Sequence, residues 1–184
     1  MKKQKKWWIA AAVMVAALSS GKAWAVYTPF TDATITVTPI VDVSLTISPT
    51  TYAFGTIAVN TSSVTATRLS LSNNGTINAA VDKRIQADSA DWVADTSTTT
   101  PNHYVLYVAT STTRPDEAGF TLADHGFGAL SNVTGLKGLG GDAPILTAGG
   151  ALPSVDLWFR LDMPVTVTTA APQTITVRFT GTGQ

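Results

Sequence analysis

Apolar and polar residues alternate along several stretches of this chain. In residues 34–48 the apolar side chains fall on odd positions and the polar ones on even positions, with Ile40 as an exception and Pro39 as an interruption. Residues 155–163 and 175–179 repeat this alternation. A period of two turns one face of a strand toward a core and the other toward solvent. The pattern predicts two strands, or one edge strand with a break, in 34–48, and one strand in each later stretch.

A turn signal divides two further alternating segments. Asn73-Asn74-Gly75 lies between residues 65–71 and 77–85, and Asn-Gly favours the turns that close two-residue hairpins. We therefore expect these segments to form a hairpin. Residues 104–108 add a short apolar run of strand type. Seven to nine short strands, with no spacing typical of strand–helix–strand units, predict an all-β, antiparallel sandwich.

The region 109–153 departs from this pattern. It holds most of the glycines of the chain and few alternating positions. Thr113-Arg-Pro115-Asp-Glu117 has a hydroxyl cap, an early proline and acidic residues, which together predict the start of a short helix. We expect a single β-sandwich domain over residues 26–184, with a long irregular insertion around 109–153.

The first 25 residues have the features of a secretory signal peptide. Four lysines within the first six residues precede an uncharged apolar run at 7–18, and Ala23-Trp24-Ala25 resembles a cleavage site. The apolar run is shorter than the roughly 20 residues of a membrane span. We expect cleavage after Ala25 and a mature chain without a transmembrane segment. The predicted location is secreted, in the periplasm, at the cell surface or outside the cell.

Charge and cysteine content narrow the class of protein. Cleavage after Ala25 would leave seven basic residues against twelve acidic ones, a net charge of −5. Nucleic-acid binding needs clustered lysine and arginine, so we expect no nucleic-acid partner. The chain contains no cysteine, which excludes disulfides and a lipid anchor at the cleavage site. An exported chain of this kind depends on packing and backbone pairing alone.

Two segments carry a resemblance to a known group. Residues 52–60, Tyr-Ala-Phe-Gly-Thr-Ile-Ala-Val-Asn, and residues 69–76, Leu-Ser-Leu-Ser-Asn-Asn-Gly-Thr, resemble immunoglobulin-like domains of the ASH/MSP-like kind. The resemblance covers about residues 45–85. It implies an immunoglobulin-like β-sandwich with a structural or binding role, because the group is mostly non-catalytic. The chain is also similar, more loosely, to exported pilin-like and surface β-sandwich subunits of bacteria, although it lacks the disulfide that many of them carry.

The histidines offer little catalytic or metal chemistry. His103 and His125 could join a carboxylate such as Asp124 in a metal site only if the fold brought them together. The alternative is that each is an ordinary surface or loop histidine. No G-x-S-x-G elbow is present for a serine nucleophile.

The carboxylates could in principle form pairs or bind calcium. The candidates are Asp116 with Glu117, and the cluster Asp88, Asp91 and Asp95. Their spacing does not match an EF-hand loop, and the alternative is a set of solvated loop residues. We therefore expect no enzyme activity, no metal and no cofactor.

Trp158 is the one candidate ligand-binding residue. It occupies the polar parity of the strand at 155–163, between Asp156 and Arg160. An outward tryptophan between polar groups can stack on a sugar or anchor an interface. The alternative is that a second layer, such as the 109–150 region, covers it.

Residues 26–40 have two interpretations. They are either an ordinary first strand, which is the favoured interpretation, or an extension that completes the sheet of a neighbouring subunit. The favoured function is a secreted, non-enzymatic structural or adhesive protein of the bacterial cell envelope. The alternatives are a carbohydrate-binding module and a pilin-like filament subunit that assembles by strand exchange. The partners left open are further copies of the chain, other envelope proteins and a cell-surface glycan.

Overall fold

The computed structural model describes residues 34–128, 130, 133–150 and 152–184. The chain divides into two units, Met1–Thr38 and Pro39–Gln184. Residues 34–38 are the described part of the first unit. The predicted signal peptide, 1–25, lies outside the described residues. Within the described ranges, no helix has the length and apolar character that crossing a bilayer would require.

The first sheet has six strands. Their order is β1-β3-β9-β6-β5, and β2 also pairs with β9, beyond the end of β3. All of these pairs are antiparallel except β5 with β6, which is parallel. The strands are β1 (Leu45–Ser48), β2 (Ser62–Val64), β3 (Leu69–Asn73), β5 (Val93–Ala94), β6 (His103–Thr110) and β9 (Ser154–Asp162).

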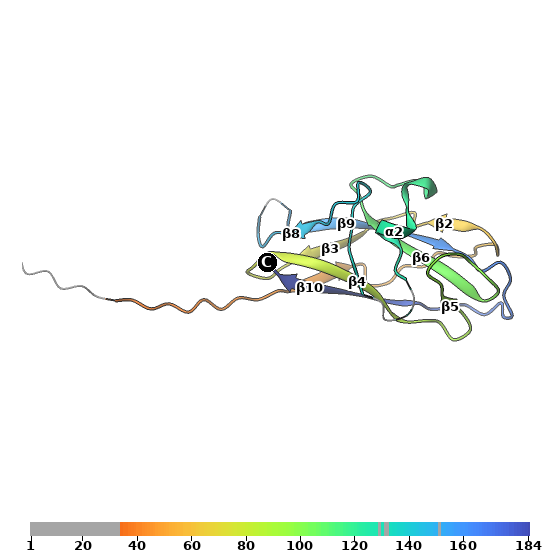
Figure 1. Cartoon of the computed structure of the whole chain (residues 1–184), viewed down its shortest axis with the longest axis horizontal. Helices are drawn as coiled ribbons and strands as arrows, with labels where there is room; N and C mark the ends of the chain where they lie inside the picture. The colour runs from red at the N-terminus through yellow and green to blue at the C-terminus, as the bar shows by residue number, and fades with distance from the viewer. Residues whose placement is uncertain (1–33, 129, 131–132, 151) are drawn as a thin grey trace, which may run out of the picture. The chain divides into compact units, whose positions relative to one another are not determined.

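The second sheet is built around β4 (Ala79–Ala87). One edge of β4 pairs with β10 (Thr176–Gly183) along its length, and the other pairs with the short strands β7 (Thr134–Gly135) and β8 (Ile145–Leu146). Figure 1 shows β4 and β10 running along one side of the unit Pro39–Gln184, opposite β3 and β9. β10 is therefore an outer strand of its sheet, as β1 is of the first.

The two sheets share one hydrophobic core, and the prediction of an all-β fold is confirmed. Odd positions of β4 and β9 point inward, as the alternation predicted. The core joins Val81 and Ile85 from the second sheet to Leu71, Leu157 and Phe159 from the first. Phe159 also stacks on the ring of Phe127 at a centroid distance of 6.3 Å.

The predicted hairpin at Asn73-Asn74-Gly75 is wrong. β3 and β4 do not pair with each other, because the turn carries the chain from one sheet to the other. The buried Asn73 amide explains the crossing, since its Nδ2 donates to the carbonyls of Ile77 and Leu146, and its Oδ1 accepts from the Gly75 amide. The asparagine thus uses its side chain to hold a crossover in place of a hairpin.

Two other expectations need correction. Of residues 34–48, only β1 is a strand, and 34–44 pair with no strand. The helix expected to open at Thr113 is also wrong, because Asp116 instead caps a single 3₁₀ turn, η1 (Glu117–Gly119), through its side chain. The region 109–153 further contains α2 (Leu122–His125), β7 and β8.

Candidate functional site: an open apolar groove and an unpaired segment

A groove opens between the two sheets where the outer strands β1 and β10 lie against each other. Its volume is about 1260 Å³. One wall comes from β1 and residues 50–59, the other from residues 167–179, and β3 and β9 supply side chains at the bottom. Arg178 is the one charged residue among the described residues that line the groove.

The hydrophobic core is incomplete along this groove. Nine hydrophobic side chains pack against the core but are only partly buried, and every one of them lines the groove. Solvent therefore reaches the core along this groove, whereas the interior of a finished domain is close-packed. The nine residues are Leu45, Ile47, Tyr52, Phe54, Ile57, Trp92, Ile175, Val177 and Phe179.

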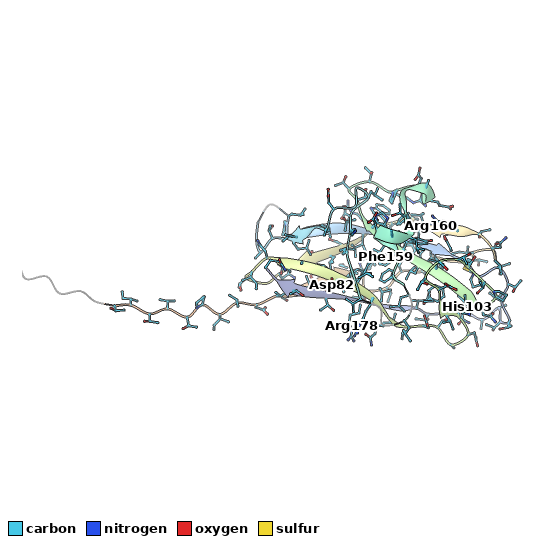
Figure 2. The ribbon with its side chains drawn as sticks, in the orientation of Figure 1. Asp82, His103, Phe159, Arg160 and Arg178 are labelled. Carbon is cyan, nitrogen blue, oxygen red and sulfur yellow. The ribbon has the colours of Figure 1, made fainter. Side chains whose placement is uncertain are left out.

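One edge of β10 is open beside the groove. Its backbone pairs with β4 on one side, and in the described part of the chain no backbone hydrogen bond joins β10 to another segment on the other side. The side chains of β10 alternate, with Val177 and Phe179 turned toward the groove and half-buried, and Arg178 and Thr180 exposed. Figure 2 shows Phe159 inside the unit and Arg178 on its outer side.

Residues 34–41 form an exposed apolar segment. Ile35 is 85% exposed, Val37 77% and Ile40 90%, and no residue of the segment belongs to a strand. Soluble proteins rarely leave contiguous apolar residues in water unless they serve an interaction. The alternation that predicted a strand here is present in the sequence, but its partner is absent among the described residues.

Directly after this segment, contacts within the second unit hold the backbone in place. The Asp42 carbonyl accepts hydrogen bonds from the Thr76 amide at 2.8 Å, and the Asp42 amide donates to the Thr76 hydroxyl at 2.9 Å. Val43 packs closely on Gly181 of β10, where a Cβ atom would stand 2.6 Å from the valine Cγ1. The unpaired segment therefore ends at a well-defined anchor.

Trp158, the predicted ligand-binding residue, is buried. It is 7% exposed and belongs to a second hydrophobic cluster, on the outer face of the first sheet, with Tyr107 and Phe120. Its indole Nε1 donates to the Ser111 carbonyl at 2.8 Å. The covering layer suggested as the alternative is the arrangement found.

The two histidines lie in different environments. His103 begins β6, and its Nδ1 is 3.6 Å from Asp95 Oδ2. His125 ends α2 and is 1% exposed, which the sequence did not predict; its Nδ1 accepts from the Thr121 amide, and its Nε2 is 2.9 Å from the Gly138 carbonyl. Among the described residues, no three metal-ligating side chains gather as a metal site.

The aspartates of the 88–95 region serve local structure. Asp88 accepts hydrogen bonds from the Tyr104 hydroxyl at 2.6 Å and from the Ala94 amide at 3.1 Å. Burial and the Asp88 contact raise the pKa of Tyr104 well above its usual value. Asp95 accepts from the Thr96 amide, and Asp91 from the Gln173 amide side chain.

Lys83 is a buried residue that the sequence reasoning missed. It is 1% exposed, its Nζ donates to the Asp124 carbonyl at 3.1 Å, and it lies 5.7 Å from the Phe127 ring centroid. Burial, with a smaller contribution from the positive charge of Lys137, lowers the pKa of Lys83 to about 8. Its odd position in the alternating run 77–85 was the signal that could have identified it.

Comparison with protein-family models, with curated proteins and with solved structures finds no match for this chain. The groove, the open edge of β10 and the unpaired segment are therefore the observations from which a function can be argued.

Proposed function

We propose that this chain is a secreted, non-enzymatic structural subunit of the bacterial cell envelope, and that its copies join by strand exchange. The observation that carries the proposal is the segment 34–41, which alternates like a strand but pairs with none. In this proposal the mature domain is an immunoglobulin-like β-sandwich that receives a strand from a neighbour. Export is inferred from the features of residues 1–25.

The physical support is the free-energy cost of leaving the apolar side chains of residues 34–41 in water and the edge of β10 without a hydrogen-bonded neighbour. Fully burying one valine or isoleucine side chain stabilises a protein by roughly 1.5–3 kcal/mol. Ile35, Val37 and Val41 all remain exposed, so their burial is available to drive association. An extended segment that adds to a free sheet edge also gains main-chain hydrogen bonds. Open edges of this kind are otherwise an aggregation liability.

The carbohydrate-binding alternative has less support. It rested on an outward-facing Trp158, and that side chain is buried under residues of the 111–120 region. The structural proposal uses the features that are exposed instead. Binding of the mature chain to cell-wall polysaccharide on a glycan array, with no self-assembly, would favour the alternative.

Deletion of residues 26–38 tests the proposal. The mature chain and the deletion variant are purified, incubated at equal concentration and compared by electron microscopy and sedimentation velocity. We expect polymers from the mature chain and folded monomers from the deletion variant. Before assembly, monomers of the two proteins should have the same urea midpoint. Polymers of equal length from both proteins, or monomers from both, would contradict strand exchange.

A further inference from the structure

We infer that the acceptor for residues 34–41 is the free edge of β10 in a second copy of this chain, where Ile35, Val37 and Val41 would fill the groove. This inference rests on the proposed strand exchange and adds the surface on which the exchange takes place. It concerns an acceptor that lies wholly within Pro39–Gln184.

Length and backbone pairing favour this edge. β10 has eight residues, and residues 34–41 also number eight. At about 3.3 Å per residue, each spans roughly 26 Å when extended. The donated strand would become the new edge of the second sheet, and Pro39 is tolerated there because an edge strand has one side without a hydrogen-bonding partner.

The two faces of the donor match the two faces of β10. Val177 and Phe179 line the groove and are half-buried, whereas Thr176, Arg178, Thr180 and Thr182 are exposed, although Thr176 and Arg178 also belong to the lining. In the donor, the odd positions are apolar, and three of the four even positions are threonines, Thr34, Thr36 and Thr38, with Ile40 as the exception. A strand placed with its odd residues inward would therefore cover the half-buried core and continue the threonine-rich outer face.

The chemistry of the groove points to a peptide. A volume of about 1260 Å³ exceeds the roughly 300–1,000 Å³ of small-molecule pockets. Two buried polar atoms of groove residues, Gln86 Oε1 and Trp92 Nε1, have no hydrogen-bond partner in the described structure. A peptide offers donors and acceptors to such atoms, whereas a hydrocarbon chain offers neither. The donor carries no charge, and the lining of the groove is also nearly free of charge, since Arg178 is its one charged residue among those described.

The anchor after the segment favours a second copy over the same chain. Hydrogen bonds to Thr76 fix Asp42, and Val43 packs on Gly181 near the end of β10. To lie along β10 of its own chain, the segment would have to reverse at Ile40 and Val41. Both are β-branched residues, which favour extended backbone over tight turns.

Engineered cysteines test the acceptor, because the chain has none of its own. Thr36→Cys is made in one preparation, and Thr176→Cys, Arg178→Cys or Thr180→Cys in others. Opposed side chains on neighbouring strands have Cβ atoms about 4.5–5.5 Å apart, close to the range that a disulfide spans. The matched controls are Thr112→Cys, exposed in the layer over the other sheet, and Ala53→Cys, on the opposite wall of the groove.

The preparations are mixed in pairs, allowed to assemble, oxidised and compared on non-reducing gels. We expect at least one β10 variant to give on the order of tenfold more mixed dimer than either control, because assembly raises the local concentration of the two thiols. Polymers whose cross-links favour Ala53→Cys, or no site, would overturn the β10 acceptor and leave strand exchange standing. Mixtures that contain only monomers would overturn strand exchange itself.

Discussion

The buried amine of Lys83 makes the stability of the domain depend on pH in a defined direction. The pKa falls from 10.5 in the unfolded chain to about 8 in the folded one. One pKa unit corresponds to about 1.4 kcal/mol, so folding with a charged Lys83 costs about 3 kcal/mol relative to folding with a neutral one. That cost is present almost in full at pH 7 and below, where both states bind the proton.

The sign of the dependence follows from proton linkage. Between about pH 8 and 10.5 the unfolded chain binds more protons than the folded one, so stability rises with pH. The raised pKa of Tyr104 acts in the opposite direction above about pH 10, where the tyrosine ionises only in the unfolded chain. The interval from pH 7 to 9.5 therefore isolates the lysine, and the two pKa values of Lys83 give a gain of about 2 kcal/mol across it.

Urea unfolding of the monomeric deletion variant at pH 7, 8, 9 and 9.5 measures this gain. Lys83→Met should abolish the rise between pH 7 and 9.5. The matched control, Lys137→Met, removes the ion pair with Asp124 but keeps the buried amine, so a smaller rise should persist, because burial is the larger cause of the lowered pKa of Lys83. A flat profile in the unsubstituted chain, or a rise that survives Lys83→Met, would refute the assignment.

Two further predictions concern packing away from the groove and beside it. Trp158→Phe removes the hydrogen bond to Ser111 and should lower the free energy of unfolding by about 1–2 kcal/mol while polymers still form; loss of polymers with unchanged stability would show that Trp158 is an interface residue instead. Gly181→Val places side-chain atoms against Val43 and should cost about 1–3 kcal/mol by overpacking, measured by urea midpoint. Gly135→Ala is its control, since nothing lies within 4 Å of the added Cβ, and equal effects of the two substitutions would contradict the packing argument.

The alternation of apolar and polar residues predicted which face of a strand is buried, because that feature depends on a local pattern alone. Positions such as Leu157, Phe159 and Leu161 of β9 face the core because a pleated strand with one buried face reads apolar at every second residue. Pairing partners depend on residues far apart in the sequence. The Asn73 side chain, which turns an expected hairpin into a crossover, bonds a carbonyl at Leu146, and no local pattern reveals that contact.

The same limit applies to the candidate site. The alternation of residues 34–48 was visible in the sequence, but only the structure separates β1 from the unpaired residues before it. The groove is lined by segments that are distant in the sequence, including residues 50–59 and 167–179, so it could not be read from spacing. Trp158 is a different case. The sequence placed it correctly among the polar positions of its strand, but it did not decide whether a second layer covers that face.

The central claim is that the odd face of residues 34–41 joins one copy of the chain to the next. Sedimentation velocity of Val37→Asp beside Thr36→Asp tests it most directly, because the two variants add the same charge to adjacent residues on opposite faces of the segment. Strand exchange predicts monomers from Val37→Asp, since a carboxylate would enter the apolar groove, and polymers from Thr36→Asp. Polymers from both variants, or the reverse order, would contradict it.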